Sequence, residues 1–329
     1  MTNVLVTGGS GYIGGYCVLA LLDAGHTVRT TVRDLAREPQ VRATLGADVE
    51  VVRADLGSDE GWPEAAAGCD FVLHVASPTL TGVPRDDDEM VRPAVDGTLR
   101  VLRASQRAGV RRVVLTSAIG AIAYGHPPRD TPFTEQDWTN VFADIAPYQK
   151  SKTLAERAAW DFAGREGLEL ATVNPTAVLG PVLGPDYSPS LNSLAAMLDG
   201  SQPALLKFAT GYVDVRDVAT LHLLAMTDPA AAGERFIATA GHSLWQRDLA
   251  AVLRSRLGDR AAKVPTREMP LAAARALARV NPRMRALKAI LGRDLDATAA
   301  KAERLLGWKP RPIEDTITDT AESLLALTA

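Results

Sequence analysis

Cysteine is nearly absent from this chain of 329 residues, which holds only Cys17 and Cys69. Two cysteines cannot form a disulfide framework, and neither belongs to the CxxC spacing of a zinc site. We therefore expect a protein of a reducing compartment. The five histidines are scattered without the spacing of metal ligands, so the sequence predicts no metal centre.

Net positive charge and long apolar runs are missing as well. The 36 Lys and Arg residues are outnumbered by 39 Asp and Glu residues, which gives a formal net charge of −3. A chain without a basic field is not drawn to nucleic acid or to an anionic membrane. No apolar run has transmembrane length, and no cationic leader precedes the first apolar stretch. We expect a soluble, cytoplasmic monomer or homodimer that binds a small molecule.

The first 175 residues alternate short apolar runs with helical patterns. Predicted strands lie at 4–7, 27–32, 49–53, 71–75, 112–116 and 169–173, and predicted helices at 12–24, 41–45, 86–108 and 147–166. Consecutive apolar positions fit strands buried on both faces, and their alternation with helices implies right-handed βαβ units and a parallel sheet.

Prolines interrupt the chain from residue 175 to about residue 210, and the last 85 residues read as mostly helical. We therefore expect a dinucleotide-binding α/β domain at 1–175 and a smaller, mostly helical substrate lobe at 176–329. A strand-like segment at 212–215 and a helix at 216–226 are expected to interleave the lobe with the sheet.

Glycines at positions 8, 11 and 14 follow the first strand and open the first helix, in the sequence Thr7-Gly8-Gly9-Ser10-Gly11-Tyr12-Ile13-Gly14. One glycine suits the tight turn, one the approach of backbone to a pyrophosphate, and one the contact of helix with strand. The start of the helix also offers free N–H groups to phosphate oxygens. The pattern predicts dinucleotide binding by a Rossmann-type, doubly wound sheet.

The end of the second strand indicates which dinucleotide is bound. A guanidinium at Arg33 can bind a 2′-phosphate in bidentate fashion. Asp34 follows at once and could serve a ribose hydroxyl instead. We expect NADP(H) rather than NAD(H).

Tyr148 and Lys152 lie four residues apart on the predicted helix that begins at Pro147, so they share one helix face. A nearby ammonium favours the phenolate and lowers the pKa of a tyrosine toward neutrality. Such a tyrosine can exchange a proton with a substrate oxygen while a hydride moves at carbon. The sequence therefore predicts Tyr148 and Lys152 as catalytic residues.

These motifs, with a strand that ends at Thr116-Ser117, resemble the extended short-chain dehydrogenases/reductases. Segments 27–34, 74–78, 151–156 and 174–176 are similar to the dihydroflavonol 4-reductase-like branch, which contains many aldehyde and ketone reductases. The resemblance implies cofactor contacts from Gly8, Gly11, Tyr12, Ile13, Gly14, Arg33, Asp55, Leu56, Val75, Ala76, Ser77, Thr116, Tyr148, Lys152, Pro175, Thr176 and Val178.

The chain departs from this family at Ala118, where members usually carry the serine that supplies the catalytic hydroxyl. Three explanations stay open: a local shift lets Ser117 serve, another group (Thr116, Tyr124 or water) supplies the hydrogen bond, or the enzyme is impaired. Flavonoid and CoA substrates are disfavoured, because Ala123 replaces the asparagine of plant flavonoid reductases and the extended CoA-thioester signature around Tyr148 is missing.

Together these features predict an NADP-dependent oxidoreductase that acts on carbonyl groups. We expect an uncharged, partly apolar aldehyde or ketone between Tyr148, residues 119–124 and the loop at 181–191, with Ile119, Ile122, Val182 and Leu183 in the lining. Two alternatives remain, an NAD-dependent nucleotide-sugar epimerase or hydroxysteroid dehydrogenase, and a non-catalytic NADP(H)-sensing protein.

Overall fold

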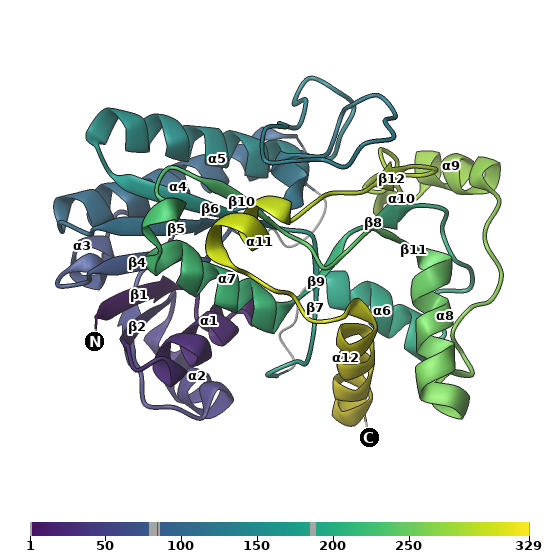
Figure 1. The fold of residues 1–329 in the computed structure, drawn as a ribbon, viewed down its shortest axis with the longest axis horizontal. Coiled ribbons are helices and arrows are strands. Elements are labelled where there is room, and N and C mark those ends of the chain that lie inside the picture. Colours follow the sequence, from purple (N-terminus) through teal and green to yellow (C-terminus); the bar gives the residue numbers. More distant parts are fainter. Residues whose placement is uncertain (1, 79–83, 85, 185–188, 329) are drawn as a thin grey trace.

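The computed structural model describes residues 2–78, 84, 86–184 and 189–328. Its centre is a seven-stranded sheet in the order β10-β6-β5-β4-β1-β2-β3, in which every neighbouring pair is parallel (Figure 1). The strands are β1 (Asn3–Thr7), β2 (Thr27–Val32), β3 (Glu50–Arg53), β4 (Phe71–His74), β5 (Arg112–Thr116), β6 (Glu169–Pro175) and β10 (Arg235–Ala238). This arrangement confirms the predicted Rossmann-type α/β fold.

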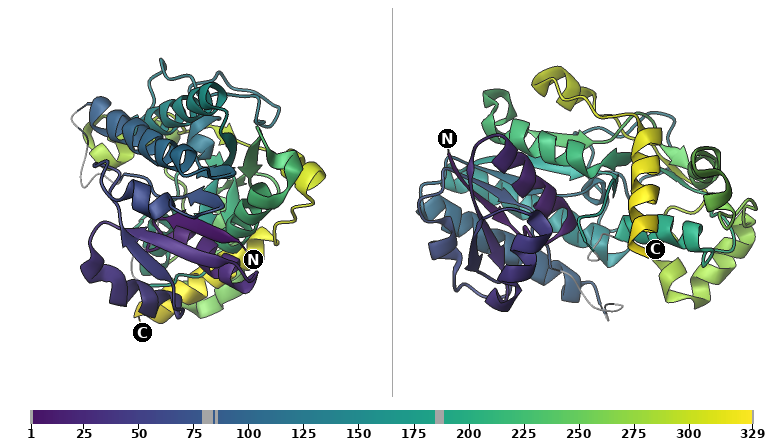
Figure 2. Two further views of the ribbon diagram at one scale, coloured as in Figure 1. Left: turned by 90° about the vertical axis from the view of Figure 1, so that its left-hand side faces the viewer. Right: turned by 90° about the horizontal axis from the view of Figure 1, so that it is seen from below.

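Helices cover both faces of the sheet (Figure 1, Figure 2). One face carries α3 (Trp62–Ala66), α4 (Asp88–Arg107) and α5 (Pro147–Glu166), and the other carries α1 (Tyr12–Asp23), α2 (Glu38–Leu45) and α7 (Val215–Thr227). Each face buries a separate apolar cluster, because the side chains of a strand alternate between the two faces. The burial of strands on both sides explains their consecutive apolar residues.

Helix α5, which carries the predicted catalytic pair, has the bounds that the sequence predicts. It begins with Pro147, whose ring suits the first helical position because no N–H is needed there. It ends at Gly167, which adopts φ 68° as the left-handed cap. These two signals fix the register of Tyr148 and Lys152 relative to the sheet.

The chain returns to the sheet after residue 175. Helix α7 covers the sheet beside α1, and β10 adds a seventh strand next to β6. The sequence did not predict β10, which is short and begins with an arginine. The strand expected at 212–215 exists as β9 (Tyr212–Asp214), but it pairs with β7 (Ala177–Leu179) in a separate sheet.

The remaining residues form a lobe at one end of the sheet (Figure 2). Its helices are α6 (Pro189–Asp199), α8 (Gln246–Leu257), α9 (Leu271–Val280), α10 (Pro282–Arg285) and α12 (Ile313–Thr328), whereas α11 (Ala300–Leu306) packs against β10 and α7 of the main sheet. A small sheet of β8 (Ala209–Thr210), β11 (Leu244–Trp245) and β12 (Asp294–Leu295) joins them. Within the described ranges, no helix is both long and apolar enough to cross a bilayer.

Candidate active site

The parallel sheet gathers the predicted site residues along one edge. Strands β1, β2, β3, β4, β5 and β6 are neighbours, so their carboxyl ends form a continuous rim. The glycine loop follows β1, Arg33 follows β2, and Asp55 lies two residues beyond β3. Val75 follows β4, and Thr116 ends β5. Ligands of doubly wound sheets bind at this edge.

The glycine loop turns from β1 into α1 so tightly that Gly9 and Gly14 have no space for a side chain. Gly8 has φ +71°, and a Cβ on Gly14 would lie 2.2 Å from the carbonyl oxygen of Gly8. A Cβ on Gly9 would lie 2.3 Å from Oγ1 of Thr30. The backbone therefore forms a cradle at the N-terminus of α1, and no acidic residue occupies the first turn of this helix. This geometry fits the pyrophosphate of a dinucleotide.

His74, at the end of β4, holds the glycine loop in place through a hydrogen bond to Thr7. Its Nδ1 lies 2.8 Å from Oγ1 of Thr7, and that hydroxyl also accepts the N–H of Ala76 at 3.0 Å. Burial lowers the pKa of His74 to about 3, so the ring is neutral. The contacts tie the end of β1 to the end of β4, and His74 is a packed core residue.

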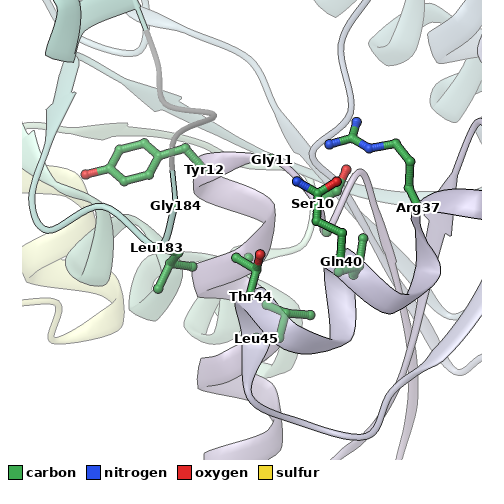
Figure 3. A pocket seen from close by; sticks show the side chains of 12 residues that line it. Ser10, Gly11, Tyr12, Arg37, Gln40, Thr44, Leu45, Leu183 and Gly184 are labelled. Carbon is green, nitrogen blue, oxygen red and sulfur yellow. The ribbon is translucent and has the colours of Figure 1, made fainter. Parts of the chain in front are cut away.

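A pocket beside the glycine loop, which we call the glycine-loop pocket, reveals an arginine that the sequence prediction missed (Figure 3). It is lined by Gly9, Ser10, Gly11, Tyr12, Gly15, Arg37, Gln40, Val41, Thr44, Leu45, Leu183 and Gly184. Arg37 lies on the short 3-10 helix Leu35–Arg37, directly before α2, whereas Arg33 is exposed at the end of β2. The spacing of the two arginines, four residues apart after β2, was the available signal.

The other predicted cofactor residues differ in their exposure. Asp55, Ala76 and Ser77 stand at the rim, and Asp55 accepts the N–H of Gly57 at 2.8 Å. Pro175, Thr176 and Val178, at the end of β6 and just beyond it, are buried. Leu56 and Val75 are partly buried, each against one of the two apolar clusters of the sheet. The structure places all of them near the carboxyl edge, where the side chains of Asp55 and Ser77 are exposed.

Lys152 lines a second pocket, the Lys152 pocket, at the ends of β4 and β5. Its walls are Ala76, Ser77, Pro78, Ala94, Thr98, Leu115, Thr116, Ser117, Lys152, Ala155 and Glu156. Nζ of Lys152 donates to the carbonyl oxygen of Thr116 at 3.5 Å. Burial lowers the pKa of Lys152 to about 8, and the charge of Glu156 opposes this shift.

Tyr148 lies one helical turn before Lys152 and is 45% exposed. A Cβ on Gly120 would lie 3.5 Å from Cε1 of its ring, so the turn at 119–121 packs against the tyrosine. Burial of its hydroxyl end, followed by the electrostatic effect of the neighbouring Tyr124, raises the pKa of Tyr148 to about 12. The downward shift expected from Lys152 is wrong for this structure, because burial raises the pKa and the Lys152 ammonium donates to Thr116 instead.

The hydroxyls next to Ala118 have buried partners. Oγ of Ser117 donates to Oε2 of Glu156 at 2.5 Å. Glu156 is fully buried and also accepts from Arg235 Nε at 2.6 Å and from Asn174 Nδ2 at 2.7 Å. This hydrogen bond gives Ser117 a place in a buried polar network and does not support the prediction that it acts in catalysis.

The expected substrate lining also needs correction. Ile122 is fully buried, and Leu191 is buried in the main core, so neither side chain is available to a ligand. Leu183 lines the glycine-loop pocket, where it contacts Gly15. Residues 185–188 of the expected loop lie outside the described residues. Partly buried side chains that pack on the same cluster as Ile119 are Tyr124, Met269, Leu271, Met284 and Leu287.

Metal chemistry has no candidate ligands in the part of the chain that the structure describes. There, no group of three or more His, Cys, Asp and Glu side chains is arranged to hold a metal ion.

The family of the chain follows from comparison with known proteins. The model of the NAD dependent epimerase/dehydratase family matches residues 4–238. Tetraketide alpha-pyrone reductase 2 of Arabidopsis thaliana is 37% identical over 264 residues, which cover 74% of this chain and 80% of the relative. Dihydroflavonol 4-reductase of Zea mays is 36% identical over 268 residues, which cover 77% and 74% of the two chains. The chain therefore belongs to this family and to its dihydroflavonol 4-reductase-like branch of extended short-chain dehydrogenases/reductases, and it is an oxidoreductase.

Solved structures agree with the fold. The yeast methylglyoxal/isovaleraldehyde reductase Gre2, complexed with NADPH, is 24% identical and superimposes with a TM-score of 0.83 over 99% of both chains. Gre2 of Candida albicans, also in complex with NADPH, is 26% identical with a TM-score of 0.80 over 100% of both chains. The cofactor predicted from Arg33 is the one that both of these structures contain.

Proposed function

We propose that the protein is an NADPH-dependent reductase of aldehydes or ketones, in which Tyr148 donates a proton to the carbonyl oxygen. One observation carries this proposal: Tyr148 and Lys152 share a face of α5 at the same sheet edge where the glycine loop forms an anion cradle. A phenol and an ammonium one helical turn apart have the chemistry of proton transfer beside a bound dinucleotide.

The cofactor site fits NADPH. The backbone at the start of α1 would hold the pyrophosphate, since side chains are excluded from the cradle. Arg37 lines the adjoining pocket together with Ser10, and Arg33 stands at the end of β2. Two guanidinium groups on this side favour a 2′-phosphate over a free ribose hydroxyl.

The raised pKa of Tyr148, about 12, suits the direction of reduction. A phenol with this pKa keeps its proton at neutral pH and can donate it to the oxygen of a carbonyl. When bound, the nicotinamide supplies the hydride to the carbonyl carbon. Lys152, with a pKa of about 8, is mostly cationic at pH 7 and can hold the ribose hydroxyls of the cofactor.

The substrate side is apolar and adaptable. Tyr124, Leu271 and two methionines, Met269 and Met284, stand partly exposed on the cluster that contains Ile119. Methionine side chains are flexible and fit ligands of varied shape. These residues support an uncharged, partly hydrophobic aldehyde or ketone, whereas Ala123 argues against the flavonoids that are named for some relatives.

The test is NADPH oxidation with a panel of aldehydes and ketones, in the wild type and in Tyr148→Phe. We expect turnover with at least one carbonyl compound and a loss of about 10²–10⁴-fold in Tyr148→Phe, because the general acid is removed. NADPH affinity, measured by fluorescence titration, should be nearly unchanged in the variant. Tight binding of NADPH without turnover of any carbonyl would favour the sensing protein, which the missing hydroxyl at Ala118 supports.

A further inference from the structure

We propose that Tyr124 donates the second hydrogen bond to the substrate's carbonyl oxygen, in place of the hydroxyl that Ala118 lacks. This inference rests on the proposed reductase function. In the reaction, the hydride adds to the carbonyl carbon and the proton of Tyr148 goes to the oxygen. Tyr124 keeps its own proton and only donates a hydrogen bond as negative charge develops on that oxygen.

The two hydroxyls that precede Ala118 are directed elsewhere. His222 is buried, and its Nδ1 lies 2.8 Å from the carbonyl oxygen of Val218, so Nδ1 carries the proton. Nε2 of His222 therefore accepts the hydroxyl of Thr116 at 2.7 Å. The hydroxyl of Ser117 donates to Glu156. Successive residues of a strand point to opposite faces, so the two hydroxyls lie on opposite sides of the sheet, each bonded to a buried partner.

A clamp around Thr139 holds Tyr124 close to the start of α5. Oγ1 of Thr139 donates to the carbonyl oxygen of Gly120 at 2.8 Å and accepts the N–H of Tyr124 at 3.0 Å. Gly120 packs directly on the ring of Tyr148. The clamp therefore fixes residues 120–124 as one turn against the proposed proton donor.

The hydroxyl of Tyr124 is oriented by Gln149, the neighbour of Tyr148. The side chain of Gln149 lies beside the Tyr124 phenol and opposes the rise of its pKa, the effect expected when the amide N–H is directed at the phenolic oxygen. Oε1 of Gln149 is buried and has no hydrogen-bond partner among the described residues, which agrees with the amide nitrogen facing the phenol. Because the oxygen of Tyr124 accepts from this N–H, its own O–H remains available to a ligand.

The shifted pKa values of the two phenols agree with this placement. Burial raises the pKa of Tyr124, so the phenol is protonated and can donate at neutral pH. Tyr124 in turn raises the pKa of Tyr148, which places the two phenols within electrostatic reach of each other. A carbonyl oxygen at Tyr148 would meet two phenolic donors.

The first experiment compares Tyr124→Phe with the matched variant Tyr212→Phe, whose phenol is buried on β9. With the best carbonyl compound of the panel, Tyr124→Phe should lower kcat by about 10²–10³-fold, the effect of removing one oxyanion donor. The dissociation constant for NADPH should stay the same. Tyr212→Phe should keep the wild-type kcat.

The second experiment separates catalysis from structure by rescue. Adding Ala118→Ser to Tyr124→Phe should restore most of the lost kcat, whereas Ala118→Ser alone should change the wild type little. A fall in kcat that Ala118→Ser does not restore would mean a structural role for Tyr124 and would overturn the proposal. An unchanged kcat in Tyr124→Phe, with Tyr148→Phe still inactive, would overturn it as well and leave the proposed function intact.

Discussion

The glycine loop and the segment from Thr116 to Tyr124 lie at the same sheet edge but specify their function in different ways. The loop works through backbone: Gly14 must approach Gly8 so closely that a Cβ would clash at 2.2 Å. The segment 116–124 works through side chains, and their roles depend on distant partners such as Glu156 and His222. A backbone site can be recognised from a short pattern, whereas a side-chain site needs the tertiary structure.

Gly14→Ala tests the site that works through backbone, and it should have the largest effect on NADPH binding. The new Cβ would meet the backbone of Gly8, which cannot move aside without opening the loop. We expect NADPH binding to be lost, as followed by fluorescence titration, with a lower melting temperature.

The matched control is Gly164→Ala on α5, because a Cβ there meets nothing within 4 Å. This variant should bind NADPH like the wild type and melt at an equal or slightly higher temperature, since alanine is the better helix former. Equal NADPH affinity in the two variants would contradict the steric role of Gly14.

The same contrast explains what the sequence could predict. The strands β1 to β6 and the bounds of α5 follow from apolar runs, Pro147 and Gly167, all local signals. Strand β10 was missed because it begins with a charged residue, Arg235, which only the remote Glu156 makes compatible with burial. The partner of Ser117 was equally hidden, since Glu156 lies 39 residues further along the chain.

The preference for NADPH depends on both kinds of site, because arginine side chains lie beside the backbone of the glycine loop. Arg33→Ala and Arg37→Ala should each raise the Michaelis constant for NADPH by about ten- to a hundredfold, the range for loss of a hydrogen bond to a charged group. Arg37→Ala should be the more severe, since Arg37 lines the glycine-loop pocket. The Michaelis constant for NADH should hardly change. Equal effects on both cofactors would contradict a 2′-phosphate site.

The smallest effect concerns pH. Burial disfavours the charged form of Lys152 and lowers its pKa to about 8, so the ammonium is lost as pH rises through this value. NADPH should therefore bind more weakly at pH 9 than at pH 7, as measured by titration calorimetry. Lys152→Arg keeps its charge at both pH values and should bind with little pH dependence. A wild type without this dependence would show that Lys152 does not contact the cofactor.

The central claim is hydride transfer to a carbonyl carbon with proton donation by Tyr148, and isotope labelling tests it most directly. NADPH deuterated at C4 of the nicotinamide is incubated with the carbonyl panel, and the alcohols are analysed by mass spectrometry. The account predicts one deuterium on the carbinol carbon with the wild type and very little labelled alcohol with Tyr148→Phe. Equal labelling by both proteins, or bound NADPH that labels no carbonyl compound at all, would contradict it.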